Sequence, residues 1–251
     1  MSNYSGFAYM YDLLMGDIPY KTWAAYIDSV LTRHLGGNRT DKIVLDMACG
    51  TGNITCLLAD IGYDMIGVDI STDMLSQAQA KADGRRILFL AQDIRELDLY
   101  GTIDAAVCTC DGLNYILEAG QLAEVFGRVK MFLNPGGVFI FDMNTEFKFK
   151  EVLSDKSFVA KVKDAAYEWD NHFDAVTGVN RYHVIFMPEG GTPFEEVHHQ
   201  RAFPVGVVCD LLQKAGFDSV VVYDGYSDEL VKDDSMRAVF VCQKPQILDR
   251  F

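Results

Sequence analysis

The chain has 251 residues, of which 49% are hydrophobic and 23% charged, a balance that supports a substantial core and excludes an intrinsically disordered protein. The formal net charge of −14 disfavours nucleic-acid partners, and no apolar run approaches the roughly 20 residues that cross a bilayer. The opening MSNYSGFAYM lacks the features of a signal peptide, and the six cysteines show no framework spacing, so we expect a cytoplasmic protein with reduced thiols.

The predicted elements begin with an aromatic stretch over residues 1–18 and a helix over 19–35. Short apolar runs then alternate with amphipathic segments, which is typical of a parallel sheet covered by helices on both faces. A turn over 134–137 precedes the fifth strand. We expect strands over 43–47, 65–68, 87–91, 103–108 and 138–141, and helices over 52–61, 71–82 and 122–132.

The pattern changes after Asp142. Aromatic-rich stretches at 167–173, 179–187 and 194–203 predict a small antiparallel insertion. A helix over 204–215 and strands over 219–223 and 238–243 then complete the main sheet. We interpret residues 1–251 as one domain with an N-terminal lid and helix (1–40), a cofactor-binding core (41–142), the insertion (143–203) and a closing segment (204–251).

The most informative segment is DMACGTG, in which a buried strand ends at a glycine-rich turn that leads into a helix. Gly50 and Gly52 let the backbone approach a ligand closely and leave the N-terminus of the helix open. Asp69 ends the next strand, where an acid can accept hydrogen bonds from both hydroxyls of a ribose. Asp93 follows the third strand. Because the carboxyl ends of parallel strands meet at one edge of a sheet, these acids are expected to line one crevice.

Two ligands compete for such a turn, a dinucleotide and S-adenosylmethionine. The dinucleotide fingerprint GxGxxG requires a third glycine where this sequence has Thr55. A pyrophosphate also disfavours a nearby anion, whereas Asp46 directly precedes the turn. An acid at this position suits a ligand that carries an ammonium and a sulfonium, so the pattern favours S-adenosylmethionine.

The segments LDMACGTGNIT, GVDIS, AQDIREL, IDAAVCTCDGLNY and LNPGGVFIFD resemble, in this order, the five motifs of class I S-adenosylmethionine-dependent methyltransferases. The resemblance covers roughly residues 40–142 and includes the closing pattern at 204–243. It implies a Rossmann-like α/β fold with a mostly parallel seven-stranded sheet. The nearest subgroup is the bacterial small-molecule methyltransferases, including amino-sugar N-methyltransferases, which share the Tyr11-Asp12 segment and the antiparallel insertion.

This resemblance implies roles for residues at the carboxyl edge of the sheet. Asp46 would orient the turn, Asp69 would bind the ribose, and Asp93 would bind the adenine amino group. Tyr11 and Tyr20 would fold over the cofactor as part of a lid. The implied cofactor-binding residues are Tyr11, Tyr20, Asp46, Ala48, Cys49, Gly50, Gly52, Asp69, Ile70, Met74, Gln92, Asp93, Ile94 and Cys110.

The stretch CTCDGLNY, which starts at Cys108, would flank the transferred methyl group. Its two cysteines lack the further soft ligands of a metal site and the CxxC spacing of a redox pair, so no metal is expected and Cys108 is interpreted as a core thiol. Asp111, Asn114 and Tyr115 are the candidates in this stretch to contact a methyl acceptor.

The insertion contains the segment EEVHHQR. Alternation along a strand places Glu196, His198 and Gln200 on one face and Glu195, His199 and Arg201 on the other. The small-molecule subgroup that this chain resembles often carries a similar histidine-polar-Gln/Glu-Arg pattern, and the resemblance implies that His198 faces the pocket. His198 and Tyr115 are the candidate catalytic residues, which would position or deprotonate the nucleophile. Each also fits a structural role, His198 as a hydrogen-bonded core histidine and Tyr115 as an aromatic residue at the rim.

We therefore predict a monomeric or homodimeric enzyme that transfers a methyl group from S-adenosylmethionine to a nitrogen or oxygen of a small molecule by in-line displacement. Neither nucleic acid nor membrane is an expected partner. Two alternatives stay open. One is a methyltransferase that acts on a protein or tRNA, and the other is a non-catalytic protein that binds S-adenosylmethionine or S-adenosylhomocysteine.

Overall fold

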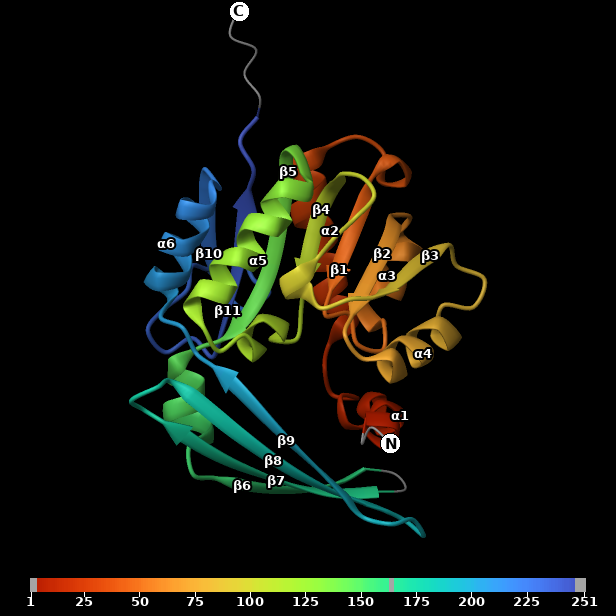
Figure 1. The fold of residues 1–251 in the computed structure, drawn as a ribbon, viewed down its shortest axis with the longest axis vertical. Helices are drawn as coiled ribbons and strands as arrows, with labels where there is room; N and C mark the ends of the chain where they lie inside the picture. The colour runs from red at the N-terminus through yellow and green to blue at the C-terminus, as the bar shows by residue number, and fades with distance from the viewer. Residues whose placement is uncertain (1–3, 163–164, 247–251) are drawn as a thin grey trace, which may run out of the picture.

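The computed structural model describes residues 4–162 and 165–246. Its central sheet (Figure 1) consists of β1 (Ile43–Met47), β2 (Asp64–Asp69), β3 (Ile87–Ala91), β4 (Ile103–Cys108), β5 (Leu133–Asn144), β10 (Ser219–Asp224) and β11 (Arg237–Gln243). The seven strands follow the order β10-β11-β5-β4-β1-β2-β3. Strand β11 runs antiparallel to β5 and β10, whereas the other pairs are parallel. This topology confirms the predicted Rossmann-like α/β fold.

Helices cover both faces of the central sheet, because its strands are apolar on both sides. The helices are α1 (Tyr4–Leu14), α2 (Tyr20–Leu35), α3 (Asn53–Ile61), α4 (Thr72–Lys81), α5 (Ala119–Phe132) and α6 (Val205–Ala215). Phe126 of α5 and Leu212 of α6 are buried on one face, and Ile27 of α2 and Leu58 of α3 are buried on the other. Within the described ranges, no helix is long and apolar enough to cross a membrane.

A second, antiparallel sheet lies beyond the carboxyl ends of the parallel strands (Figure 1). It consists of β6 (Ser157–Val162), β7 (Ala165–Asp174), β8 (Val179–Pro188) and β9 (Phe194–Arg201). This sheet confirms the predicted insertion. Strand β6 was not among the individually predicted strands, and neither was the π-helix η4 (Lys148–Leu153) that connects β5 to the sheet. Helix α1 lies at the same edge of the central sheet as the insertion.

Element boundaries differ from the sequence prediction mainly around α5 and β5. Helix α5 begins three residues before the predicted start at 122, and β5 continues directly from it. The predicted turn over 134–137 survives as an irregularity inside β5. Ile103 pairs with Leu133 and Ala105 with Val138, so four residues on β5 lie opposite a single residue on β4. The residues predicted to form a turn therefore form a bulge within the strand.

Candidate active site

The glycine-rich turn between β1 and α3 forms the centre of the candidate site. Ala48, Gly50 and Gly52 all adopt positive φ values, of 51°, 54° and 74°. Glycine takes such angles freely, but alanine does not, so the surrounding structure must hold Ala48 in this conformation. A Cβ atom built on Gly50 would meet nothing within 4 Å. The backbone is therefore open at Gly50 to the close approach of a ligand.

Asp69 connects this turn to the neighbouring strand. Its carboxylate accepts hydrogen bonds from the backbone N–H of Gly50 and of Ser71, both at 2.8 Å. The residue is 8% exposed, and burial raises its pKa above the ordinary aspartate value. Each carboxylate oxygen keeps a further lone pair, so Asp69 can hold the turn and still accept hydrogen bonds from hydroxyl groups of a ligand.

Asp46 lies buried beneath the turn. Its Oδ2 accepts a hydrogen bond from Thr55 Oγ1 at 2.5 Å, whereas its Oδ1 is buried without a hydrogen-bond partner in the described part of the chain. Burial, reinforced by the nearby charge of Asp69, raises the pKa of Asp46 to about 7. An acid with an unused lone pair beneath an open turn suits a ligand that brings positive charge, and S-adenosylmethionine carries both an ammonium and a sulfonium.

Apolar residues lie beside the turn, at the ends of β2 and β3. Ile70 directly follows Asp69 and is 68% exposed, which is unusual for an isoleucine at the end of a buried strand. Met74 is buried near the start of α4, and Ile94 is partly buried in the short helix η2 (Ile94–Glu96). Cys49 is also close, because a Cβ on Gly67 would approach its Sγ to 3.1 Å. The exposed Ile70 offers a flat aromatic ligand an apolar surface.

The polar residues that follow β3 are already engaged. Arg95 Nε donates to both carboxylate oxygens of Asp93, at 3.0 and 2.9 Å, and this guanidinium lowers the pKa of Asp93. The side-chain amide of Gln92 exchanges two hydrogen bonds of 3.1 Å with the backbone of Asp98. Asp93 therefore needs to keep a lone pair outside the Arg95 contact if it is to accept a hydrogen bond from an adenine amino group.

Helix α1 is fastened to the glycine turn through Asp12, a residue to which the sequence prediction gave no binding role. Its carboxylate accepts hydrogen bonds from Thr51 Oγ1 at 2.6 Å and from Asn53 Nδ2 at 2.9 Å. It also forms an ion pair with Lys81 Nζ at 2.7 Å. These contacts join α1, the turn and α4, so the N-terminal segment closes one side of the site.

The two predicted lid tyrosines meet the loop that follows β4. Tyr20 Oη lies 4.0 Å from Cys110 Sγ. Burial raises the pKa of Tyr11 well above the ordinary tyrosine value, and the adjacent Cys110, Tyr20, Asp111 and Tyr115 raise it further. Tyr11 therefore lies beside Tyr20 and the loop after β4, on the acceptor side of the site.

The loop after β4 shows the roles of Cys108 and Cys110. Cys108 is fully buried, which confirms that it is a core thiol. Cys110 and Asp111 have φ values of 56° and 53°, and their backbone N–H groups both donate to Asp142, at 3.0 and 2.7 Å. Burial and the charge of Asp142 raise the pKa of Cys110, so its thiol stays protonated at neutral pH. This strained loop positions side chains at the lip of the site and offers no thiolate.

Arg237 lies at the centre of a buried charge cluster that sequence reasoning missed. It forms ion pairs with Asp142 and, at 2.9 Å, with Asp111, and its guanidinium lies 5.2 Å from the ring centroid of Trp23. Tyr226 also donates to Asp142. Burial opposes the charge of Asp111, but Arg237 outweighs it and, with a nearby lysine, lowers the pKa of that acid. The cluster fixes the loop after β4 against β5 and β11.

A topological signal could have identified Arg237. The last strand of this fold runs antiparallel to its neighbour, so its first residue lies at the edge where the parallel strands end. The predicted strand began one residue later, at 238, and left Arg237 outside. An arginine at the start of that strand lies opposite Asn144 at the end of β5, two residues along from Asp142, and is placed to neutralise that acid.

The acceptor side joins the loop after β4 to strand β9. Tyr115 Oη lies 3.4 Å from His198 Nδ1, and the two rings meet edge to face. Gln200 Nε2 donates to Asp111 at 2.7 Å, which confirms that the Glu196, His198 and Gln200 face of β9 points toward the central sheet. Burial, together with the neighbouring His199, lowers the pKa of His198, so its imidazole is neutral at pH 7.

Asn114 does not face an acceptor, contrary to the expectation from its position in the loop. Its side chain is fully buried. It donates to the backbone carbonyl of Arg201 at 2.8 Å and exchanges hydrogen bonds with the backbone of Asn144. Because Asn144 ends β5 and Arg201 ends β9, Asn114 fastens both ends of the insertion to the central sheet.

A glycine turn that is open at Gly50 and an acid at the end of β2 lie side by side at the carboxyl edge of this sheet, an arrangement typical of class I S-adenosylmethionine-dependent methyltransferases. Residues 44–137 match the family model for the methyltransferase domain. The chain is 36% identical to a Bacillus subtilis protein named "Putative methyltransferase YqeM", over 98% of each chain. It belongs to the S-adenosylmethionine-dependent methyltransferase family, and its cofactor is S-adenosylmethionine.

Solved structures agree with this assignment. An S-adenosylmethionine-dependent methyltransferase from Clostridium acetobutylicum superposes with a TM-score of 0.85 at 29% identity, covering 97% of this chain and 100% of the other. The sugar N-methyltransferase KedS8 from a Streptoalloteichus species shares the fold with a TM-score of 0.77 at 22% identity, covering 94% of this chain and 93% of its own.

Proposed function

We propose that this methyltransferase acts on a nitrogen or oxygen atom of a small molecule. The observation that carries the proposal is the contact between Tyr115 and His198, 3.4 Å apart. It brings a phenol from the loop after β4 and a neutral imidazole from the insertion to one point beside Tyr11 and Cys110. These are groups that can orient an acceptor and take its proton.

The contact between Asp69 and the open glycine turn supports the cofactor-binding set predicted from the sequence. Asp69 would accept hydrogen bonds from the ribose, and Ile70 would contact the adenine. When bound, S-adenosylmethionine supplies an electrophilic methyl carbon on a sulfonium leaving group. The ribose and adenine would be held by Asp69, Ile70, Met74, Gln92, Asp93 and Ile94, and the methionine portion by Tyr11, Tyr20, Asp46, Ala48, Cys49, Gly50, Gly52 and Cys110.

The acceptor-side residues would act through alignment and proton removal. His198 is neutral at pH 7 because burial lowers its pKa, so its imidazole is able to accept the proton of an attacking amine or hydroxyl. The contact with Tyr115 orients the ring. Tyr11 and Tyr20, held by α1 and the start of α2, exclude water from the reacting atoms.

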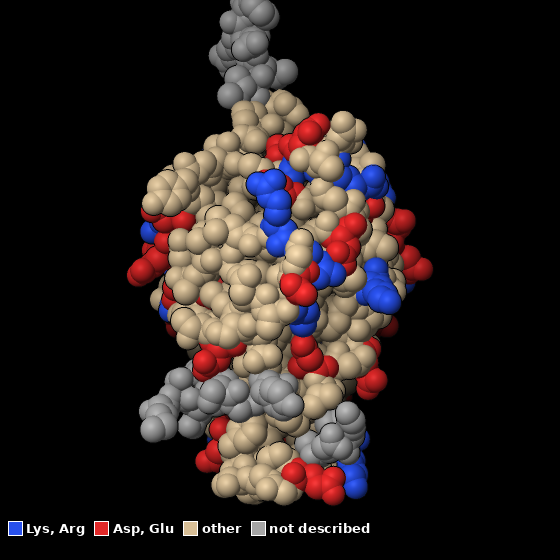
Figure 2. All heavy atoms as spheres, turned by 90° about the vertical axis from the view of Figure 1, so that its right-hand side faces the viewer, with Lys and Arg blue, Asp and Glu red and all other residues tan. Residues whose placement is uncertain are grey.

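Three observations support a small acceptor over a macromolecule. On the face shown in Figure 2, acidic and basic side chains are interspersed, and no continuous basic area follows the surface. The formal charge of −14 also opposes the approach of RNA. The insertion and α1 both lie at the edge that carries the site, which suits a compact acceptor.

The acceptor class can be tested by fractionation. Wild-type protein and S-adenosylmethionine are incubated separately with a low-molecular-weight metabolite fraction, a tRNA fraction and a protein fraction, and S-adenosylhomocysteine release is measured. We expect release with the metabolite fraction and a mass increase of one methyl group in one component. Release only with tRNA or protein would contradict the proposal, and binding of S-adenosylhomocysteine with no release in any fraction would indicate a non-catalytic binder.

A further inference from the structure

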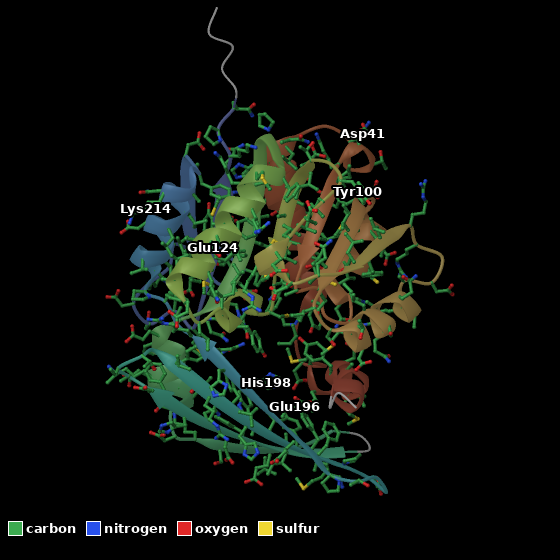
Figure 3. All side chains as sticks on the ribbon, viewed as in Figure 1. Asp41, Tyr100, Glu124, Glu196, His198 and Lys214 are labelled. Atoms are coloured by element: carbon green, nitrogen blue, oxygen red, sulfur yellow. The ribbon has the colours of Figure 1, made fainter. Side chains whose placement is uncertain are left out.

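A row of three polar side chains extends from the reacting centre along β9. Gln200 contacts Asp111, and His198 contacts Tyr115. Glu196 is the next residue on the same face, roughly 7 Å beyond His198, because alternate residues of a strand are spaced by about that distance. Figure 3 shows Glu196 and His198 on the side of β9 that faces α1. The row therefore leads away from the position of the methyl group along the insertion.

Glu196 is a buried acid that the protein itself does not satisfy. The residue is 8% exposed, and its Oε1 is buried without a hydrogen-bond partner in the described ranges. Its cross-strand neighbour is Val184, which cannot offset a charge. The adjacent Glu195 shows the contrast, because it points to the other face and pairs with His183 at 2.8 Å. A buried carboxyl group without a partner destabilises the fold, so a ligand that donates a hydrogen bond or brings a positive charge to Glu196 would be stabilised there.

The same face carries a second unsatisfied polar atom among aromatic side chains. Trp169 lies opposite Val184 on β7, so it is two strands, or roughly 10 Å, from Glu196. Its Nε1 is buried without a hydrogen-bond partner in the part of the chain that the structure describes. Tyr182 packs beside it, with ring centroids 5.6 Å apart. A carboxylate on the same face of the sheet as aromatic rings can offer an ammonium group both a counter-charge and the faces of the rings.

We propose that Glu196 binds a second, cationic nitrogen of the methyl acceptor, one that is not itself methylated. The acceptor is then a small molecule whose ammonium group lies roughly 7 Å from the reacting atom, the spacing of Glu196 from His198 along the strand. The inference rests on the proposed transfer to a small molecule, and it specifies the chemical class of that molecule. The indole N–H of Trp169 is available to an oxygen of the same ligand.

The binding test uses 1,5-diaminopentane, whose extended length approximates two residues of strand, and 1-aminopentane as the monoamine control. Both are titrated in the presence of S-adenosylhomocysteine. We expect the diamine to bind the wild-type protein more tightly than the monoamine does. Glu196→Gln keeps the shape of the side chain and removes its charge, and it should weaken diamine binding about 10- to 100-fold. Glu195→Gln removes the same charge from the opposite face and should leave diamine binding unchanged.

Equal diamine affinity in the wild type and Glu196→Gln, or no preference for the diamine over the monoamine, would overturn the inference. Turnover separates this failure from failure of the proposed function. Suppose that the enzyme methylates a metabolite that has no second cationic group and whose KM is the same in Glu196→Gln and the wild type. In that case only the inference fails, and the proposed function stands. If no metabolite is methylated while the diamine still binds through Glu196, the proposed function fails and the cation site stands.

Discussion

The carboxylate of Asp69 at the end of β2 accepts a hydrogen bond from the backbone N–H of Gly50, 2.8 Å away in the glycine turn that follows β1. The same carboxylate holds Ser71 at the start of α4. A residue that the motif pattern assigns to ligand binding therefore also sets the shape of the turn. A substitution at Asp69 can therefore change both ligand binding and the shape of the turn. Variants must be chosen so that the two effects can be measured separately.

Two replacements of Asp69 are expected to weaken cofactor binding to different extents. Asp69→Ala removes every acceptor, and since hydrogen bonds to a charged group contribute about 1.5–3 kcal/mol each, affinity for S-adenosylhomocysteine should fall at least about tenfold. Asp69→Asn keeps one carbonyl oxygen and should lose less. Titration calorimetry measures both variants, and their melting temperatures without ligand report the effect on the turn. Unchanged affinity in folded Asp69→Ala would show that Asp69 serves the turn alone.

Asp46 should make stability depend on pH. Its pKa is raised to about 7 by burial, so the folded protein keeps the proton that the unfolded chain loses near pH 4. Stability from this group is therefore present at low pH and is lost as the pH rises through the folded pKa, at about 1.4 kcal/mol per unit. Asp46→Asn cannot ionise, so relative to wild type it should gain about 3 kcal/mol between pH 4 and 7.

Urea denaturation of both proteins across this pH range measures the difference. Asp60→Asn provides the control, because the Arg85 guanidinium lowers the pKa of Asp60 and its charge is favourable in the folded protein. That variant should show no gain with rising pH. A constant difference between wild type and Asp46→Asn would mean that Asp46 is ionised in the folded protein throughout.

Asp12→Ala should release α1 from the glycine turn without unfolding the protein. The change removes the acceptor of Thr51 and Asn53 and the partner of Lys81. Because these contacts are partly exposed, we expect little change in overall stability but faster hydrogen exchange over residues 4–14 and weaker S-adenosylhomocysteine binding. Asp17→Ala alters an exposed acid just beyond α1 and should have neither effect. Unchanged exchange in Asp12→Ala would show that other contacts hold the helix.

Tyr115 and His198 should affect turnover and leave cofactor affinity nearly unchanged. Both lie on the acceptor side, and groups that position a nucleophile or remove its proton typically contribute 10²- to 10⁴-fold. Tyr115→Phe and His198→Gln should therefore lower kcat, as measured by S-adenosylhomocysteine release. Cys108→Ser is the comparison, because a hydroxyl in the core should reduce stability without changing turnover.

The pH profile gives a second measurement on His198. Burial lowers its pKa, so the base form persists below the ordinary histidine value of about 6.5. The rate should fall only at lower pH, when the imidazole becomes protonated, and His198→Gln should remove that limb of the profile. A limb that is identical in the variant would assign proton removal to another group.

The central sheet was predictable because its strands are short apolar runs that alternate with amphipathic segments. The predicted helix over 71–82 starts at Ser71, whose side chain caps α4 by accepting a hydrogen bond from the Met74 N–H. Alternation predicted which residues of β9 share a face, and the family resemblance indicated that the face with His198 points toward the site. Strand β6 was not predicted as an individual strand, because its sequence SFVAKV is short and lacks the aromatic pattern of the neighbouring strands.

Contacts between distant segments could not be predicted from local patterns. Arg237 and Asp111 are 126 positions apart in the chain, and Asn114 reaches Arg201 across 87 positions. The sequence around Asp111 or Asn114 does not distinguish a buried side chain with a structural role from one that contacts an acceptor. The topology of the last strand was the one regularity that could have indicated Arg237, since it fixes which edge of the sheet that residue occupies.

The fastening of the insertion by Asn114 has an evolutionary consequence. The chain leaves the central sheet at Asn144 and returns at Arg201, and one side chain holds the backbone at both points. Everything between these points can be exchanged as a cassette without shifting the register of the strands that carry the glycine turn. A lineage that keeps this junction can therefore acquire new acceptors by replacing the insertion while it inherits the cofactor half intact.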